Sequence, residues 1–200
     1  MAAAHPFAED PAPDPIGEQR LLIHGLTWGQ YVTMRDLLDD HAGLRLTYLE
    51  GTLEIMSPSP EHEREKKIIA RLIEAWAIER RFPLNGYGST TFKKQAAERG
   101  AEPDECYVVG TPLKDVPDFA IEVVVTSGGI NKLSVYRGLG VPEVWCFHKG
   151  RFYLYSLKDN GYEPIPRSGY VPDLDLDHLA AFVDRHDQTE AVIAYRDSLR

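Results

Sequence analysis

Two acidic residues and one lysine stand out in the sequence by their types and their spacing. Asp104 opens the segment "DECYVV", Glu122 stands in the middle of "DFAIEVVV", and Lys132 comes ten residues after Glu122. Two carboxylates that meet in space can hold a hard divalent cation such as Mg²⁺ or Mn²⁺. A lysine beside them can stabilise charge that develops on a phosphoryl group. The three residues together would therefore suit metal-assisted phosphate chemistry.

Glu122 is unusual because its segment predicts a strand in the interior of a sheet. Residues 119–125 are mostly apolar and β-branched, which is typical of a strand that is covered on both faces. An ionised carboxylate there is costly unless a positive group meets it or the carboxylate lies at the open edge of a cleft. The alternative interpretation is an exposed or ion-paired structural glutamate.

Asp104 is the partner that we expect for Glu122. It begins the preceding predicted strand, and adjacent strands lie about 4.8 Å apart, so the two carboxylates converge if the strands pair in the right register. Asp118 is nearer in sequence, but four strand residues separate it from Glu122, which is roughly 13 Å at about 3.3 Å per residue. Asp118 and Glu122 therefore cannot hold one ion directly.

Lys132 falls in the first turn of a helix that we expect over about 129–139, with Ser127 as its candidate N-cap. A cation at this end of a helix opposes the helix dipole. A bound anion such as a phosphate would favour it. Tyr136 follows four residues later on the same helical face. The alternative is a solvated lysine that tolerates a small cost.

Hydrophobic periodicity predicts the elements that must position these residues. They are a helix from Thr27 to Leu38, a hairpin over 44–57 that turns at Glu50-Gly51, a long helix from Ser59 to about Arg81, two strands within 85–97, the strands of Asp104 and Glu122, the helix of Lys132, a hairpin over 143–158, an edge strand near 160–166, and two terminal helices over 174–183 and 187–199. We therefore predict an α/β (α+β) architecture, with a mixed sheet flanked by helices.

Composition bounds the domain organisation and the compartment. The chain has 200 residues with 43% hydrophobic content, which suits a single domain over 20–200. Residues 1–19 are rich in Ala, Pro and acidic residues, which favours a disordered leader without the features of a secretory signal. Cys106 and Cys146 lie in apolar runs without Cys-x-x-Cys spacing, and no apolar run is long enough for a bilayer. We expect a cytoplasmic protein with reduced thiols and no membrane contact.

Charge and the remaining polar residues give weaker indications. The formal net charge of -9 argues against a nonspecific nucleic-acid coat but leaves room for a local basic groove. Lys93, Lys94 and Arg99 form a small basic stretch near Asp104, either a solvated hairpin or a contact for backbone phosphates. His62 could face the cleft, but we expect a solvent-exposed histidine in the first turn of the long helix. The other histidines have no spacing suited to zinc.

Several segments carry a resemblance when they are taken in order. Pro103-Asp104, Glu122 and Lys132 resemble the active site of the PD-(D/E)XK nuclease superfamily. The segments "YLEGTLEIMSPSPEH", "DFAIEVVVTS" and "GVPEVW" resemble more closely the Uma-two family of predicted restriction endonucleases, over about residues 26–183. The resemblance implies a restriction-endonuclease-like fold, with Mg²⁺ or Mn²⁺ held by Asp104 and Glu122 and with Lys132 as a catalytic residue.

One departure from the superfamily pattern concerns the lysine. The superfamily places a lysine two residues after the acidic residue, where this chain has Val124. In the Uma-two family the lysine is found on the following helix, which Lys132 matches. Glu50 matches an early acidic position of the family, and the resemblance implies a role for it as a further catalytic residue that binds metal or water. The alternative for Glu50 is a turn residue beside Gly51.

These observations predict a divalent-metal-dependent endonuclease that hydrolyses phosphodiester bonds of DNA. The competing hypothesis is an inactive nuclease-fold module that binds nucleic acid or another partner. We also expect a homodimer, because the hairpin over 143–158 is rich in aromatic residues, among them Trp145 and Phe147, and large exposed apolar patches often mark interfaces. The alternative is that the terminal helices cover these aromatic residues within one subunit.

Overall fold

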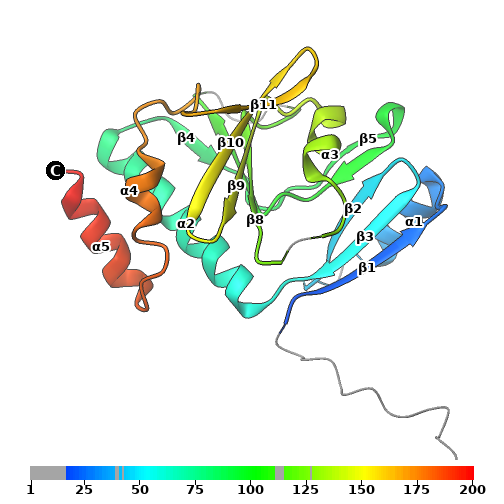
Figure 1. Cartoon of the computed structure of the whole chain (residues 1–200), viewed down its shortest axis with the longest axis horizontal. Coiled ribbons are helices and arrows are strands. Elements are labelled where there is room, and N and C mark those ends of the chain that lie inside the picture. The colour runs from blue at the N-terminus through cyan, green and yellow to red at the C-terminus, as the bar shows by residue number, and fades with distance from the viewer. Residues whose placement is uncertain (1–16, 39–40, 42, 111–114, 127) are drawn as a thin grey trace, which may run out of the picture.

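Two β-sheets and five α-helices make up the described part of the chain (Figure 1). The structure is a computed structural model that describes residues 17–38, 41, 43–110, 115–126 and 128–200. The helices are α1 (Trp28–Leu38), α2 (Pro60–Arg80), α3 (Lys132–Leu139), α4 (Leu176–Ala180) and α5 (Gln188–Ser198), with a short 3₁₀ helix at Gln95–Ala97. None of the described helices is long and apolar enough to cross a membrane.

The larger sheet has six strands and carries Glu122. In spatial order these are β11 (Gly161–Ile165), β10 (Arg151–Lys158), β9 (Glu143–His148), β8 (Phe119–Val123), β7 (Glu105–Val109) and β4 (Leu84–Gly86). Only β8 and β9 pair in parallel, across α3 as the crossover, and the other described pairs are antiparallel. Every residue of β8 is buried, as its apolar sequence predicts.

The smaller sheet has five strands and lies beside α3. Its spatial order is β1 (Gln19–His24), β3 (Thr52–Ser57), β2 (Arg45–Leu49), β6 (Arg99–Ala101) and β5 (Phe92–Lys94). Helix α1 packs on this sheet through Tyr31, whose ring stacks on Tyr48 with centroids 4.8 Å apart. In Figure 1, α3 stands between the two sheets, and it contacts strands of both.

Helices on both faces of the larger sheet form its core. On one face, the apolar stripe of α2 packs with α4 and α5 against Phe119, Ile121 and Trp145. On the other face, Val135 and Tyr136 of α3 pack against small residues of β8 and β9. Helix α2 begins where the sequence predicts, because the side chain of Ser59 accepts a hydrogen bond from the backbone N–H of His62 and Pro60 fills the first helical position.

Most predicted elements are confirmed, including both hairpins, the long helix and the terminal helices. The predicted single mixed sheet is wrong in one respect, because the strands divide between two sheets. Sequence patterns also missed β1 and β6. The predicted leader ended at residue 19, yet β1 begins at Gln19 and Glu18 is already bonded to the fold. Residues 1–16 and the candidate N-cap Ser127 lie outside the described residues, and the N-cap of α3 is Asn131.

Trp145 and Phe147 of the aromatic hairpin are covered within one subunit, whereas Tyr153 across the turn is 46% exposed. Trp145 and Phe147 are buried in the core that α2, α4 and α5 close. Glu143 of the same hairpin is buried too, and it accepts hydrogen bonds from Trp145 Nε1, Ser168 Oγ and the backbone N–H of Gly169. That carboxylate fixes the segment that leads from β11 to α4.

Candidate active site

Asp104 and Glu122 meet because β7 and β8 pair in the register that the sequence hypothesis requires. The antiparallel ladder joins Glu105 to Ile121, and the same register continued by one residue sets Asp104 opposite Glu122. Asp104 Oδ2 accepts a hydrogen bond of 2.8 Å from the backbone N–H of Val123, next to Glu122. Both carboxylates are buried. The two predicted metal ligands therefore lie side by side at one end of the sheet.

His62 belongs to this site, which corrects the prediction of a solvent-exposed histidine. Its side chain is buried, and Nε2 lies 2.9 Å from Asp104 Oδ1. Nδ1 lies 3.2 Å from Oε2 of Glu18, a residue that sequence analysis had placed in the leader. The local sequence around His62 is charged and gave no sign of burial, because its partners are 42 and 44 residues away in the chain.

The pKa values of the two carboxylates shift in opposite directions. Burial alone would raise the pKa of Asp104, but the hydrogen bond and charge of His62 and the N–H of Val123 lower it. Burial raises the pKa of Glu122 above its usual value, and the charge of Asp104 adds to the rise while Lys132 opposes it. Burial alone would lower the pKa of His62, but the hydrogen bond and charge of Asp104 and the charge of Glu18 raise it. Glu122 is thus the carboxylate that gains most from a bound cation.

Lys132 and Tyr136 approach Glu122 from α3. Nζ of Lys132 lies 3.6 Å from Glu122 Oε1 and donates a hydrogen bond of 2.8 Å to Thr47 Oγ1 of β2. The hydroxyl of Tyr136 donates to the same oxygen of Glu122. Lys132 is the first residue of α3, and Tyr136 lies one turn later, as the helical spacing predicts. The lysine on the helix therefore reaches the acidic residue on the strand.

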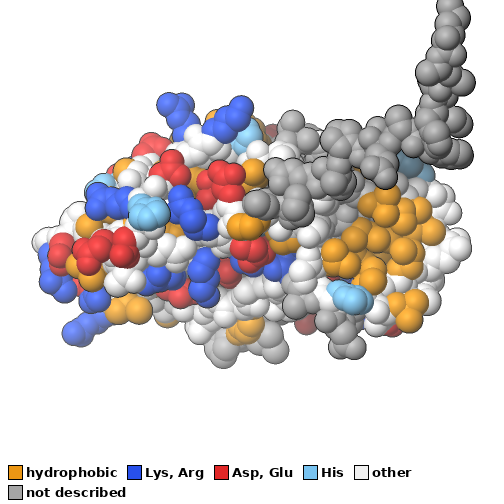
Figure 2. Space-filling view, turned by 90° about the horizontal axis from the view of Figure 1, so that it is seen from below, with side chains coloured by type: hydrophobic (Ala, Val, Ile, Leu, Met, Phe, Trp, Pro, Cys, Tyr) orange, Lys and Arg blue, Asp and Glu red, His pale blue; other side chains and the backbone are white. Residues whose placement is uncertain are grey.

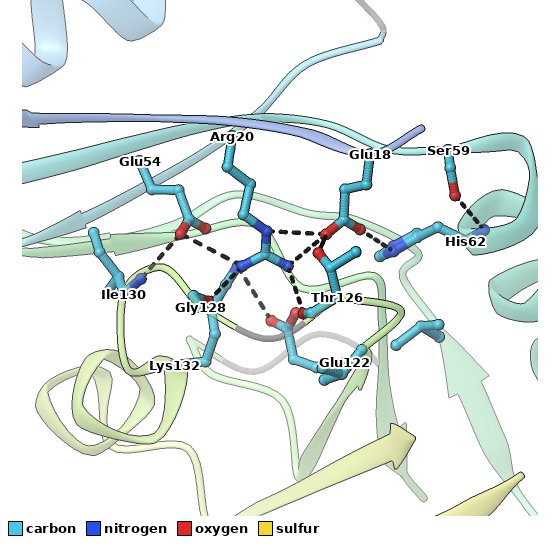
Figure 3. A network of polar contacts seen from close by, with 12 residues as sticks. Glu18, Arg20, Glu54, Ser59, His62, Glu122, Thr126, Gly128, Ile130 and Lys132 are labelled. Atoms are coloured by element: carbon cyan, nitrogen blue, oxygen red, sulfur yellow. Dashed lines mark hydrogen bonds and ion pairs between the residues drawn. The ribbon is translucent and has the colours of Figure 1, made fainter. Parts of the chain in front are cut away.

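The loop that contains Thr126 and Ile130 lies between β8, which carries Glu122, and α3, which begins at Lys132. The side chains of Glu18, Arg20 and Glu54 surround this loop (Figure 3). In Figure 3 the guanidinium of Arg20 lies between the carboxylates of Glu18 and Glu54. Arg20 donates to the carbonyl oxygen of Gly128, and Glu54 accepts from the N–H of Ile130. None of these three side chains was predicted to belong to the site.

A cavity of about 210 Å³ opens between the loop and Glu122. Its lining includes Arg20, His62, Glu122, Thr126, Lys132 and Cys146. Four charged or ionisable groups, those of Arg20, His62, Glu122 and Lys132, therefore face one shared space, while Asp104 lies behind its lining. Burial raises the pKa of the Cys146 thiol to about 12, so it lines the cavity as a neutral group.

The donor atoms suit a hard divalent cation in type. Carboxylate oxygens are the ligands that Mg²⁺ and Mn²⁺ prefer, and Asp104 and Glu122 supply them with a mutual repulsion that Lys132 and His62 offset. The hydrogen bonds to Asp104 leave lone pairs on both of its oxygens. Among the residues that the structure describes, no three acidic, histidine or cysteine side chains form a ready-made cluster. An ion held by this pair would complete its shell with other oxygens, such as water.

The structure does not bring Glu50 to this pair. Glu50 lies in the β2–β3 turn with a φ of 43°, its side chain is 67% exposed, and Oε1 binds Arg99 at 2.7 Å. A two-residue hairpin turn directs its side chain away from the cavity, which supports the turn alternative. Lys93 and Lys94 are exposed on the edge strand β5, whereas Arg99 is engaged by Glu50. Asp118 binds the N–H of Val109 instead of joining Glu122.

Comparisons with known proteins show what most of the chain is similar to. A model of the Uma2 (Uma-two) family, described as "Putative restriction endonuclease", matches residues 28–182. A crystal structure described as a "putative nuclease belonging to DUF820" from Anabaena variabilis is similar at 12% sequence identity, covers 76% of this chain and 90% of that chain, and has a TM-score of 0.41. The comparison with curated proteins gives no significant match.

Proposed function

The chain belongs to the Uma2 family, and on this basis we propose that it is a divalent-metal-dependent endonuclease that hydrolyses DNA phosphodiester bonds. The membership confirms the family resemblance and the restriction-endonuclease-like fold class predicted from the sequence. The observation that carries the proposal is the pairing of buried Asp104 and Glu122, with Lys132 beside Glu122 at a cavity that both Glu122 and Lys132 line. A structural ion pair would not require two neighbouring buried carboxylates that share one lysine.

Each residue of the site has a role in this proposal. Asp104 and Glu122 hold Mg²⁺ or Mn²⁺, which lowers the pKa of a bound water and polarises a phosphoryl oxygen. Lys132 orients the nucleophile and stabilises the charge that develops on phosphorus. Tyr136 fixes one oxygen of Glu122, and His62 fixes one oxygen of Asp104, so neither carboxylate has to reorient when the ion binds.

A second candidate function is a nuclease-fold module that binds a partner without cleaving DNA. The formal net charge of -9 favours it, because an acidic chain repels a phosphate backbone. Against it stands the retention of Asp104, Glu122 and Lys132, with Lys132 in contact with Glu122 and all three charges close enough to influence one another. The two candidates differ in whether strands are cut in the presence of a divalent ion.

A nicking assay tests the proposal. Supercoiled plasmid, linear duplex, single-stranded and branched DNA are incubated with Mg²⁺, with Mn²⁺ or with EDTA. The proposal predicts nicking or cutting of at least one form with a divalent ion and none with EDTA, and loss of that cleavage in Glu122→Gln. Glu163→Gln, on an exposed position of β11, is the matched control and should cut like wild type. Absence of cleavage of every form would favour the non-catalytic module.

We further propose a cytoplasmic homodimer, now with strand β1 as the contact. Figure 2 shows a continuous hydrophobic area at the end of the molecule that carries β1 and α1. Leu21, Leu22 and Leu37 at this end are 55%, 41% and 73% exposed. Among the described residues β1 is the edge strand of its sheet, and a second copy can pair with such an edge by two-fold symmetry. Sedimentation of wild type and of Leu21→Lys tests this dimer, which Leu21→Lys should weaken. A wild type that is monomeric at micromolar concentration would rule the dimer out.

A further inference from the structure

Strand β1 contributes to the site although it precedes the part of the chain that matches the family. The family model begins at residue 28. Glu18 lies just before β1, and Arg20 is the second residue of β1. Both side chains reach across to the loop between β8 and α3. Glu18 and Arg20 therefore lie outside the residues that match the family model.

Arg20 binds the loop and two carboxylates at once. Nη1 donates a hydrogen bond of 2.8 Å to the carbonyl oxygen of Gly128 and lies 3.6 Å from Glu54 Oε2. Nε and Nη2 donate to Glu18 Oε1 at 2.9 and 2.8 Å. The planar guanidinium fork can make these bonds together, which a lysine ammonium cannot. Arg20 is thus fixed in one orientation against the loop.

Glu18 and Glu54 complete the contacts on either side of Arg20. The buried carboxylate of Glu18 accepts from the hydroxyl of Thr126 and faces His62 Nδ1 at 3.2 Å. Glu54 Oε2 accepts from the N–H of Ile130 at 2.9 Å. Both ends of the loop, Thr126 and Ile130, are therefore tied to side chains of the smaller sheet.

Gly129 shows how closely the loop approaches these side chains. A Cβ atom at Gly129 would lie 1.9 Å from Glu54 Oε2 and 2.7 Å from Arg20 Nη1, and the backbone φ is +85°. Only glycine avoids both the clash and the cost of this φ. The packing of Arg20 and Glu54 on the loop thus explains Gly129, whereas Gly128 has open space where a Cβ atom would lie and a φ of +118°.

We propose that Arg20, together with Glu18 and Glu54, forms a clamp that positions Lys132 relative to Glu122. The loop leaves β8 directly after Glu122 and Val123 and enters α3 at Lys132, so its path sets where the ammonium group lies. Arg20 is a positioning residue, because it acts on the cavity through the loop. That the clamp holds the loop follows from the contacts alone. The effect of the clamp on cleavage rests on the proposed function.

Hydrogen exchange of the full chain tests the clamp without any need for cleavage. In Arg20→Gln, exchange in peptides that contain the Ile130 amide should accelerate about tenfold or more, since a charge-assisted contact that holds the loop is lost. Peptides from α2 and β9 should keep wild-type rates. Arg196→Gln, which removes an ion pair to Glu79 far from the site, is the control and should leave the Ile130 peptides unchanged.

Two further variants separate a clamp from a general contribution to stability. Glu54→Gln keeps an oxygen acceptor for the Ile130 N–H and should protect that amide better than Glu54→Ala. Should wild type cleave DNA, Arg20→Gln should lower kcat with little change in KM. Unchanged exchange at Ile130 in Arg20→Gln, or acceleration spread evenly over the protein, would overturn the clamp. A wild type that does not cleave, with exchange faster at Ile130 alone, would sink the proposed function and leave the clamp standing.

Discussion

The Nζ atom of Lys132 lies 3.6 Å from Oε1 of Glu122, across the loop that joins strand β8 to helix α3. Nζ also donates to Thr47, so its position does not depend on Glu122 alone. This separation lets one lysine offset part of the repulsion between the acidic residues and still face the cavity. A lysine on the helix therefore lies beside the carboxylate on the strand.

Lys132→Ala should remove cleavage while it leaves folding and metal binding nearly intact. The role assigned to Lys132 is exerted in the transition state, where loss of such a charge costs about 10²- to 10³-fold in rate. Single-turnover cleavage with Mn²⁺ measures the rate, and Mn²⁺ titration of the same variant checks binding. Cleavage at the wild-type rate would remove Lys132 from the site.

The sequence pattern was sufficient for the strands and helices around Glu122. The apolar run of β8, the alternating hairpin of β9 and β10, and the cap and stripe of α2 are local signals, and each element formed as predicted. The approach of Asp104 to Glu122 followed from strand spacing once the register was assumed. These elements depend on residues that are close in sequence, and the approach of Asp104 to Glu122 depends on the regular spacing of paired strands.

The parts that the sequence did not predict depend on long-range contacts. His62 is buried only because Glu18 and Asp104 converge on it from β1 and β7. The segment "QRLLIH" of β1 lacks strict alternation, and its pairing with β3 comes from the tertiary fold. Arg20 and Glu54 are ordinary surface residue types until the loop lies against them. No local periodicity in the sequence predicts such long-range contacts.

Glu105 contributes to the pH dependence of stability over the same range as Glu122, whose pKa burial also raises to about 7. Burial raises the pKa of Glu105 to about 7 from an ordinary 4.5, with Lys66 opposing and Glu74 adding to the rise. The native state therefore binds more protons than the unfolded state between these values, so stability falls as pH rises from about 4.5 to 7. Glu105→Gln should flatten this fall. Urea unfolding at pH 5 and pH 8 measures it, and an unchanged pH dependence would contradict the assignment.

Glu143→Ala should destabilise the fold by about 2–4 kcal/mol. The substitution leaves three donors, from Trp145, Ser168 and Gly169, without their acceptor in a buried position. Glu163→Ala, at an exposed position of β11, should cost much less. The free energy of unfolding in urea compares the two, and similar losses would show that Glu143 does not anchor the segment before α4.

The binding of Mn²⁺ to the acidic pair tests the central claim most directly. Ligand that binds only the native state raises the melting temperature by mass action, so Mn²⁺ should stabilise wild type. Asp104→Asn and Glu122→Gln should each lose that gain, because each removes one of the two carboxylates that hold the ion. Glu163→Gln should keep it. A rise in melting temperature that is equal in wild type, Asp104→Asn and Glu122→Gln would show that Asp104 and Glu122 are not the metal ligands.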